Sequence, residues 1–448
     1  MEGAGSKMRT CRDAVMEFTK AMEPFSMHGW ILEKNGQVLS EGVWKPFSLD
    51  RMHRMYSVSK SVTSLAVGIL AQEQKLALSD PIVRYFPEML SEKTPDLLKQ
   101  VTIQQMLEMA TCYAGAQYRV TDADWTRPFF EGNPTHEPGT LFSYDTSASQ
   151  VLCVLVEKLA GEDILCFMEK RLFRLIGMTG EKKWLKDPSG TSQGGTGLLM
   201  SLRDLSRLAQ YMMTDGQNII PECYLKAAVE KHIDTLERPY PEEKYGYGWQ
   251  FWRTRHGFSM YGLGGQMAIC IPEKKMSLCT VADLTMNGTG VQPIYDAFFA
   301  YLSDFDTLPE GDGTETAMCL SLKGVEGTTR SGVTEIVLSS DTLPFDRVRI
   351  CEDSVALMVE GREWTLPYAP HTYAEGIFPV CRDACISSGG WVSENRFVLL
   401  CELWGDWTCS VQLQVVTAGA RASVRLQSSL YECMQGWEGT ASGKVVVL

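Results

Sequence analysis

Apolar and polar positions along the first part of the chain follow patterns that predict both helices and strands. They predict a helix over residues 11–22, followed by two strand segments over 29–33 and 37–41. The dipeptide Asn35-Gly36 lies between these segments, and Asn-Gly between two strands favours a two-residue hairpin turn. We therefore expect a helix and then a β-hairpin near the N-terminus.

Helical patterns dominate from about residue 75 to residue 235, and strand patterns return from about residue 245. The clearest helices and strands of this region are expected over 149–160, 202–213, 247–252, 267–271, 276–281 and, as a closing helix, 291–302. The first and last parts are therefore expected to share one antiparallel sheet flanked by helices, with an all-α region inserted between them.

Beyond residue 305 the pattern changes to short strands separated by turns. After a linker-like segment, Gly311-Asp-Gly-Thr314, strands are expected over 335–338, 347–350, 356–359, 396–402, 410–416, 422–426 and 444–448. This spacing predicts a separate all-β domain, a β-sandwich or β-barrel, whose tryptophans serve core packing more readily than a ligand platform. We therefore divide the chain into a domain of residues 1–304 and a domain of residues 305–448.

Charge supports the same division and excludes some partners. The net charge is -13, and residues 1–304 carry 32 Lys and Arg against 36 Asp and Glu, whereas residues 305–448 carry 10 against 19. An acidic chain of this kind lacks the electrostatic footprint for nucleic acid or an anionic membrane. We expect a small-molecule partner, and the sequence leaves the oligomeric state open.

The composition also bears on location and cofactors. The first ten residues hold no apolar stretch typical of a secretory signal, and no run approaches the ~18 apolar residues of a membrane span. The 14 cysteines lie among apolar neighbours without a Cys-x-x-Cys motif, and the six histidines have no metal-ligand spacing. We therefore expect a cytoplasmic protein with reduced cysteines and with no metal or cofactor.

The most informative polar feature is Ser57-Val-Ser-Lys60. Residues i and i+3 lie on one helix face, so the Lys60 amine can take the Ser57 proton if burial and neighbouring positive charge keep it partly neutral. The spacing alone is weak evidence, because random placement gives roughly one or two such pairs. The apolar 3-4 spacing after Ser57 adds specificity, since it predicts a buried amphipathic helix that begins at the serine and offers free N–H groups to an anion.

Two further segments can complete such a site. Tyr144 lies at a loop-to-helix junction, where positive or hydrogen-bonding neighbours can hold it as a partial phenolate that carries protons, although alone it is better explained as a packed ring. The glycine-rich run Met260-Tyr-Gly-Leu-Gly-Gly-Gln266 begins a strand along which an acyl substrate can lie. A backbone N–H of this run can form half of an oxyanion hole, with the Ser57 N–H as the other half. Alone, the run predicts only a bulged edge strand.

Seven segments occur in a fixed order: Pro46-Phe with Asp50 and His53, Tyr56-Ser-Val-Ser-Lys-Ser61, Glu73-Gln-Lys-Leu with Asp80-Pro81 and Tyr85-Phe-Pro, Val101-Thr-Ile-Gln-Gln-Met-Leu-Glu-Met109, Pro138 to Tyr144, Gly194-Gly-Thr-Gly-Leu with Arg203-Asp-Leu, and Tyr261 to Gln266. Together they resemble the serine β-lactamase-related family, which includes class C β-lactamases, D-alanyl-D-alanine carboxypeptidases, family VIII esterases and 6-aminohexanoate-dimer hydrolases. The resemblance covers roughly residues 15–304. It implies a β-lactamase/transpeptidase-like α/β fold, with Ser57 as the acylated nucleophile, Lys60 as its base and Tyr144 as the proton shuttle.

Two departures from the family pattern concern substrate recognition. The family's Tyr-x-Asn ends here in Thr146, so a side-chain amide is replaced by a hydroxyl. The family's Lys/His-Thr/Ser-Gly element is Met260-Tyr261-Gly262, which lacks the cation that would hold a substrate carboxylate. The expected substrate-binding and oxyanion wall consists of Ser57, Thr146, Tyr261, Gly262, Leu263 and Gln266.

The sequence thus predicts a cytosolic esterase or amidase that acts on a small, largely uncharged acyl substrate through a Ser57 acyl-enzyme. The first alternative is a β-lactamase or D-Ala-D-Ala-type peptidase, in which the same three residues act on a carboxylate-bearing substrate. The second is a non-catalytic, penicillin-binding-like protein that binds an acyl or peptide ligand and uses the C-terminal β domain as a partner module.

Overall fold

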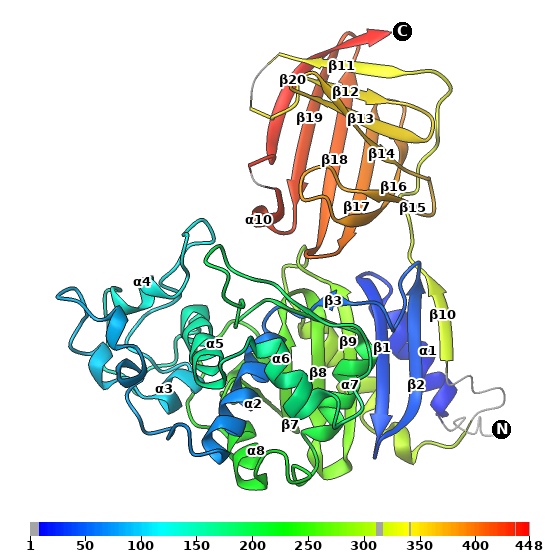
Figure 1. Cartoon of the computed structure of the whole chain (residues 1–448). Helices are drawn as coiled ribbons and strands as arrows, with labels where there is room; N and C mark the ends of the chain where they lie inside the picture. Colours follow the sequence, from blue (N-terminus) through cyan, green and yellow to red (C-terminus); the bar gives the residue numbers. More distant parts are fainter. Residues whose placement is uncertain (1–8, 311–316, 340–341, 435, 448) are drawn as a thin grey trace, which may run out of the picture. The chain divides into compact units, whose positions relative to one another are not determined.

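The computed structural model describes residues 9–310, 317–339, 342–434 and 436–447. The chain forms two compact units, of which the first ends at Cys319 and the second begins at Leu320, while the short segments 44–46 and 285–288 group with the second unit. Each unit has its own sheet (Figure 1). The linker predicted at Gly311–Thr314 lies outside the described residues.

The first unit is built on a seven-stranded sheet with the order β10-β2-β1-β9-β8-β7-β6. Its strands are β1 (Ser26–Lys34), β2 (Gln37–Lys45), β6 (Trp252–Thr254), β7 (Gly257–Gly262), β8 (Gln266–Ile271), β9 (Met276–Asp283) and β10 (Ala317–Ser321). Every pairing from β2 through β6 is antiparallel. Because β1 lies beside β9, the first and last parts of the unit share one sheet, as the sequence predicted.

Helices cover both faces of this sheet, which follows from the alternation of side chains along β1. A side chain at Gly29 would meet Leu202 of helix α7 (Leu202–Tyr211), whereas the next residue, Trp30, points the other way and packs against Phe18 of helix α1 (Cys11–Met22). The predicted hairpin turn is present, and both of its residues, Asn35 and Gly36, have positive φ, as a type I′ turn requires.

The inserted region forms a helical layer to one side of the sheet (Figure 1). It consists of α2 (Val58–Gln72), α3 (Ile103–Leu107), α4 (Arg127–Phe130), α5 (Thr146–Ala160), α6 (Ile164–Met168) and α8 (Glu222–Val229), with a small sheet of β3 (His53–Arg54), β5 (Leu198–Met200) and β4 (Lys183–Trp184). The unit closes with α9 (Gln292–Ala297) and a π-helical turn over 298–302.

Two expectations for the first unit were wrong in detail. The helix after Ser57 is not amphipathic, because every residue from Val58 to Leu70 is buried and the main apolar core surrounds it on all sides. The strand expected over 247–252 is irregular up to Trp252, where β6 begins, because Gln250 takes a left-handed conformation with a φ of 68° and turns the chain.

The second unit is an antiparallel ten-stranded sheet that curls into a near-barrel, with the order β14-β13-β12-β11-β20-β19-β18-β17-β16-β15. Its strands are β11 (Thr334–Leu338), β12 (Arg347–Ile350), β13 (Ser354–Val359), β14 (Arg362–Pro367), β15 (Ala374–Ile377), β16 (Ala384–Ser393), β17 (Arg396–Trp404), β18 (Thr408–Ala418), β19 (Arg421–Ser428) and β20 (Gly439–Val447), with a short helix α10 (Tyr431–Met434). All seven predicted strands are present, and β14, β15 and β16 were missed. Apolar side chains fill the interior, and Trp391 and Trp404 are buried.

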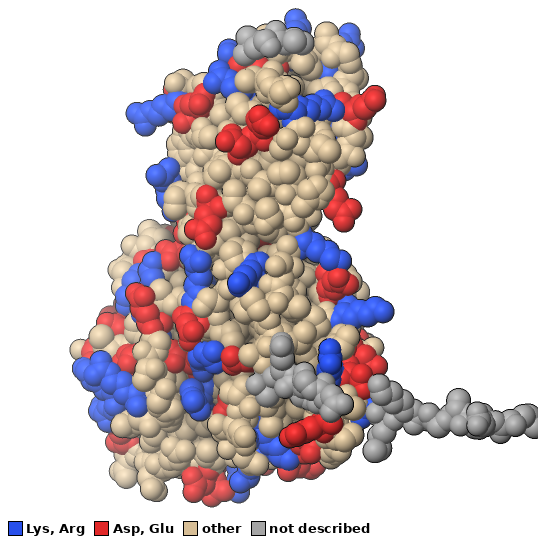
Figure 2. All heavy atoms as spheres, turned by 90° about the vertical axis from the view of Figure 1, so that its right-hand side faces the viewer, with Lys and Arg blue, Asp and Glu red and all other residues tan. Residues whose placement is uncertain are grey.

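Among the residues that the structure describes, no helix combines the length and the apolar character that crossing a bilayer requires. On the face shown in Figure 2, side chains of both charge signs are interspersed.

Candidate active site

Ser57 lies at the N-terminus of α2, directly after a strained residue. Tyr56 has a φ of 45°, which is uncommon for an aromatic residue, and the Arg54 guanidinium lies 4.9 Å from the centre of its ring. Ser57 itself has helical backbone angles, and its side chain makes no capping hydrogen bond to α2. The hydroxyl is therefore left available to side chains outside the helix backbone.

Helix α2 is buried from Val58 to Leu70, yet this stretch carries several side-chain hydroxyl groups. Each holds a neighbouring segment by a hydrogen bond: Ser59 accepts from the Leu198 N–H at 3.0 Å, Ser61 donates to the Gln250 carbonyl at 2.7 Å and Thr63 donates to the Gly194 carbonyl at 2.9 Å. These bonds satisfy the buried polar groups and fix α2 against the segments around residues 194–198 and 250.

Lys60 lies one turn after Ser57, as predicted. Its Nζ donates to Ser57 Oγ at 3.0 Å and to the Gly195 carbonyl at 2.8 Å, and the side chain is only 1% exposed. Burial lowers the pKa of Lys60 to about 7, while the negative charge of Asp145 opposes this shift. The cause is thus burial alone, and the neighbouring positive charge that we had expected is replaced by a carboxylate.

Tyr144 meets the same serine from the loop before α5. Its hydroxyl interacts with Ser57, and Lys60 Nζ lies 5.0 Å from the centre of its ring. Burial raises the pKa of Tyr144 to about 12, so the resting side chain is a neutral phenol and not the partial phenolate that we had expected. Ser57, Lys60 and Tyr144 therefore lie together, with Lys60 as the group that titrates near neutral pH.

The carbonyl that binds Lys60 belongs to a loop that lies close against α5. A side chain at Gly195 would place its Cβ 2.6 Å from Thr146 Cγ2 and 3.2 Å from Lys60 Nζ, so only glycine allows this approach. Gln150, buried within α5, accepts from the Gly194 N–H at 2.8 Å and donates to the Ser192 carbonyl at 3.0 Å. Helix α5 thus positions both Tyr144 and the acceptor for Lys60.

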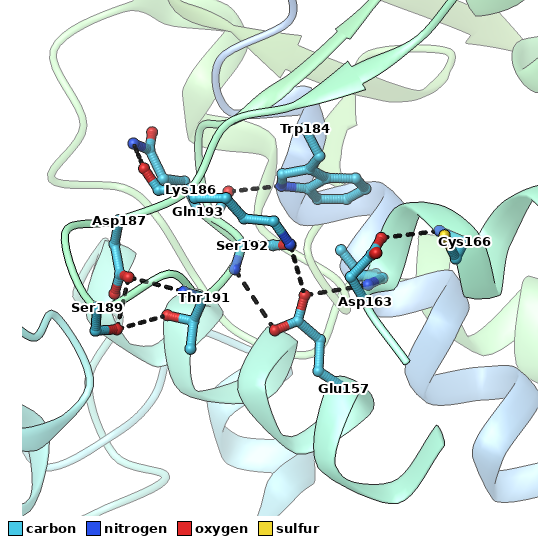
Figure 3. A network of polar contacts seen from close by, with 12 residues as sticks. Glu157, Asp163, Cys166, Trp184, Lys186, Asp187, Ser189, Thr191, Ser192 and Gln193 are labelled. Atoms are coloured by element: carbon cyan, nitrogen blue, oxygen red, sulfur yellow. Dashed lines mark hydrogen bonds and ion pairs between the residues drawn. The ribbon is translucent and has the colours of Figure 1, made fainter. Parts of the chain in front are cut away.

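A polar network braces the loop just before these glycines (Figure 3). Ser192 donates to Glu157 of α5 and accepts from Lys186 Nζ at 2.7 Å, and Glu157 also accepts from the Ile164 N–H at 3.1 Å. On the other side of the loop, Trp184 Nε1 donates to the Gln193 carbonyl at 3.0 Å. The loop therefore reaches Gly195 with little freedom to move.

The hairpin between β7 and β8 lies beside the start of α2. At Gly262 a Cβ would lie 2.2 Å from the Met55 carbonyl oxygen, which explains the glycine at the end of β7. Gln266 was predicted as a substrate contact, but its side-chain amide donates to the Leu263 and Ala282 carbonyls at 3.1 and 2.7 Å. We therefore assign Gln266 to the stability of this turn.

The other predicted wall residues differ in their surroundings. Thr146 is half-buried with its methyl group toward Gly195, and Leu263 is 40% exposed. The Tyr261 hydroxyl interacts with the buried Glu243, and burial is the main cause that raises the pKa of Tyr261.

In the described ranges, His, Cys, Asp and Glu side chains form no group of three or more that could hold a metal ion.

Sequence reasoning missed two charged groups. Asp145 is fully buried, accepts from the Ser147 N–H at 2.8 Å and has its pKa raised to about 6 by burial. It occupies the middle position of Tyr144-Asp-Thr146, where its charge could have drawn attention. Arg238, which pairs with Glu243, lies near Tyr144, and no motif marks it in the sequence.

Comparison with known proteins agrees with this geometry. The family model described as Beta-lactamase matches residues 28–296, more than half of the chain. The chain belongs to the beta-lactamase family. The matched range includes Ser57, Lys60, Tyr144 and the β7–β8 hairpin, so the site described above lies within the family domain.

Three proteins that are similar to this chain differ from it widely in sequence. The 6-aminohexanoate-dimer hydrolase of Paenarthrobacter ureafaciens is 23% identical over 217 residues, which cover 45% of this chain and only 55% of that relative. The octameric penicillin-binding protein homologue from Pyrococcus abyssi aligns with a TM-score of 0.53 at 15% identity over 96% of this chain and 99% of its own. EstCE1, a hydrolase with promiscuous acyltransferase activity, aligns with a TM-score of 0.52 at 16% identity over 64% of this chain and 99% of its own. At these identities the structures establish the fold alone.

Proposed function

We propose that this beta-lactamase-family protein is a serine hydrolase that cleaves an ester or amide of a small acyl substrate. The observation that carries the proposal is the hydrogen bond from Lys60 Nζ to Ser57 Oγ at 3.0 Å within a buried site. A pKa of about 7 leaves a substantial fraction of Lys60 unprotonated at neutral pH, so the amine can accept the serine proton. The names of two similar proteins, a 6-aminohexanoate-dimer hydrolase and the hydrolase EstCE1, support the same class.

In the acylation step, Lys60 accepts the proton of Ser57 as Oγ attacks the substrate carbonyl carbon. The oxyanion then faces the N-terminus of α2, where, among the described residues, the Ser57 N–H has no backbone carbonyl as acceptor. Tyr144, as a neutral phenol, gives its proton to the departing alcohol or amine and regains one from Lys60. The products of this step are the released leaving group and an ester of Ser57.

In the deacylation step, water attacks the Ser57 ester, and the Lys60–Tyr144 pair accepts the proton of the water. Ser57 Oγ then leaves and is reprotonated. Each half-reaction therefore begins and ends with a neutral Lys60 amine and a neutral Tyr144 phenol, so one pair of groups, with pKa values of about 7 and about 12, serves both steps.

A panel of p-nitrophenyl esters and anilides of short acyl chains tests this proposal. We expect turnover of at least one ester, a burst of one p-nitrophenol per site where deacylation is slow, and loss of both in Ser57→Ala. Tyr144→Phe should keep Ser57 reactive but slow acylation by roughly 10²-fold, as expected for lost general acid–base catalysis. If Ser57→Ala retains turnover, the proposal is wrong.

A further inference from the structure

Two cysteine side chains of the second unit lie in contact inside its core. Cys409 is on β18, and Cys433 is on the short helix α10, which lies between β19 and β20 in the chain. Their Sγ atoms are 3.1 Å apart, and both residues are fully buried. All 14 cysteines are among the residues that the structure describes, and none of them forms a disulfide. The contact is therefore one between two thiols.

This contact does not follow from strand pairing. Strand β18 pairs with β17 and β19, whereas α10 belongs to no sheet, so the path of the chain after β19 brings Cys433 to Cys409. The Cys433 thiol donates to the Leu430 carbonyl at 3.0 Å, which helps to orient its side chain. The two sulfur atoms need to approach by only about 1 Å to reach the S–S bond length of about 2.05 Å. Small side-chain rotations are enough for this.

A second pair of buried cysteines in the same core is less suited to a bond. The Cys385 and Cys401 side chains also interact, across β16 and β17. The residue opposite Cys385 is Leu403, two positions after Cys401, so the two cysteines are diagonal neighbours in the sheet. Diagonal Cα atoms are about 7–8 Å apart, whereas a disulfide usually joins Cα atoms within about 4.4–6.8 Å. The pair on β18 and α10 is therefore the better candidate for oxidation.

We propose that Cys409 and Cys433 are a redox-sensitive pair, which a small disulfide such as glutathione disulfide converts into a disulfide that links α10 to β18. This inference is independent of the proposed hydrolase function. It concerns a modification of the second unit, and it starts from the thiol form that the structure shows.

The reaction is a thiol–disulfide exchange in two steps. The thiolate of one cysteine attacks a sulfur atom of glutathione disulfide, which forms a mixed disulfide and releases one glutathione. The thiolate of the other cysteine attacks the cysteine sulfur of the mixed disulfide, which forms the Cys409–Cys433 bond and releases the second glutathione. Two electrons pass from the cysteines to glutathione disulfide, and the two thiol protons end on the two glutathione molecules.

Burial of both thiols means that the reagent reaches them only when α10 opens from the core. Helix α10 has four residues, of which Cys433 and Met434 are fully buried, so its opening exposes little apolar surface. The new bond would join positions 24 residues apart and enclose β19. Because a cross-link restricts the opened and unfolded chain, oxidation should hold α10 against β18 and slow its opening.

Equilibration of the native full-length protein with glutathione and glutathione disulfide tests the proposal. After acid quenching, the remaining thiols are blocked with iodoacetamide, and the digest is analysed by mass spectrometry. We expect a peptide that contains Cys409 linked to one that contains Cys433, and loss of this link on reduction with dithiothreitol. In concentrated urea the link should need about tenfold or more oxidising glutathione buffer, because only the fold holds the two thiols together. Amide hydrogen exchange of α10 should be about tenfold or more slower in the oxidised protein.

Cys401→Ala is the matched control for Cys409→Ala and Cys433→Ala. Cys401 is buried in the same core beside another cysteine, yet its substitution should leave the link unchanged, whereas the other two substitutions should abolish it. This control also removes the second cysteine from the tryptic peptide 397–421, so the link to Cys409 is assigned without ambiguity. The central result is measured on the wild type, so it does not depend on whether a variant folds.

A native protein that forms the link no more readily than the chain in urea would overturn the proposal. A link from Cys433 to Cys381, which lies close enough for the two groups to interact electrostatically, would overturn the pairing. Exchange of the α10 amides that slows equally when Cys409→Ala is treated with the same buffer would show that the bond does not hold α10.

Discussion

Lys60 and Asp145 are buried groups of opposite charge, and the charge of each affects the pKa of the other. Burial lowers the pKa of Lys60 to about 7 and raises that of Asp145 to about 6. Each group moves the other toward its charged form, so the ionised carboxylate keeps the Lys60 pKa higher than burial alone would. We therefore expect the reactivity of the site to depend on pH near neutrality.

The first prediction concerns this pH dependence. Protonated Lys60 cannot accept the serine proton, so kcat/KM should fall as the pH drops below about 7. In Asp145→Asn the charge that favours protonated Lys60 is gone, so the Lys60 pKa should decrease and the acidic limb of the profile should move to lower pH. The measurement is the pH profile of ester hydrolysis.

Asp163→Asn is the control for this prediction, because both aspartates cap helices: Asp145 accepts from the Ser147 N–H and Asp163 from the Cys166 N–H at 3.0 Å. Only Asp145 affects the pKa of Lys60. A limb that moves to higher pH, or that moves equally in Asp163→Asn, would contradict the assignment.

At the residue scale, the sequence was sufficient to predict that the Ser57 and Lys60 side chains lie together, because their geometry is local to one helix turn. The sequence was not sufficient to predict the surroundings of the Lys60 amine, since Gly195, whose carbonyl accepts its hydrogen bond, is 135 residues away. The place of Arg238 could not be predicted for the same reason: only the folded chain brings it to Trp252, whose ring stacks on that of Tyr144.

At the scale of elements, the close packing of α2, α5 and the loop at Gly195 defines the site, and a methyl group tests it. In Gly195→Ala the new Cβ would lie 3.2 Å from Lys60 Nζ and 2.6 Å from Thr146 Cγ2, so either the loop or Lys60 must shift. We expect esterase activity and fluorophosphonate labelling to slow by about tenfold or more, since misplacing a reacting group by 1 Å can cost 10²-fold.

Gly115→Ala is the matched control, because nothing lies within 4 Å of its Cβ position. It should keep wild-type activity, and circular dichroism should show that both variants fold. Wild-type labelling of Gly195→Ala would show that the loop is not a rigid part of the site.

A buried histidine pair joins β1 to β3. His28 Nδ1 and His53 Nε2 lie 3.1 Å apart, both side chains are buried, and burial is the main cause that lowers each pKa to about 3. Unfolded histidines have a pKa near 6.5, so between about pH 6.5 and pH 3 the unfolded chain binds more protons than the folded one. The free energy of unfolding should therefore be unaffected by this pair above pH 6.5 and should decrease as the pH falls below it.

The expected slope is at most roughly 1.4 kcal/mol per pH unit for each histidine. Denaturant unfolding between pH 4.5 and pH 7.5 measures it, and His28→Asn should reduce it, whereas His256→Asn, at an exposed position, should not. The pair would have no role in acid sensitivity if His28→Asn left the slope at its wild-type value.

Element types were predictable where the apolar period was long and regular, as in α5, α7, β8 and β9. The strand predicted over 247–252 was wrong. Its aromatic residues are typical of a strand, but here they pack in an aromatic cluster, in which the ring centroids of Tyr247 and Trp252 lie 4.9 Å apart. Tertiary packing outweighed local preference there. Strands β14 to β16 were missed because glycines and polar residues interrupt their alternation.

At the scale of the whole molecule, the second unit has its own sheet and its own apolar core, as an independently folding domain requires. All of its strand pairings fall between residues 334 and 447, and its core is formed by its own side chains. A chain of residues 320–448 should therefore fold with a cooperative transition and a β-type circular dichroism spectrum, but it should not react with a fluorophosphonate. Hydrolysis or labelling by this segment alone would show that the activity does not belong to the first unit, as we propose, but to the second.

The most direct measurement of the central claim, a nucleophilic Ser57 activated by Lys60, is fluorophosphonate labelling of the full-length protein followed by peptide mass spectrometry. The account predicts one label per chain, located on Ser57, lost in Ser57→Ala and strongly slowed in Lys60→Ala. A label on Ser59, Ser61 or Cys112, or labelling that persists in Ser57→Ala, would contradict it.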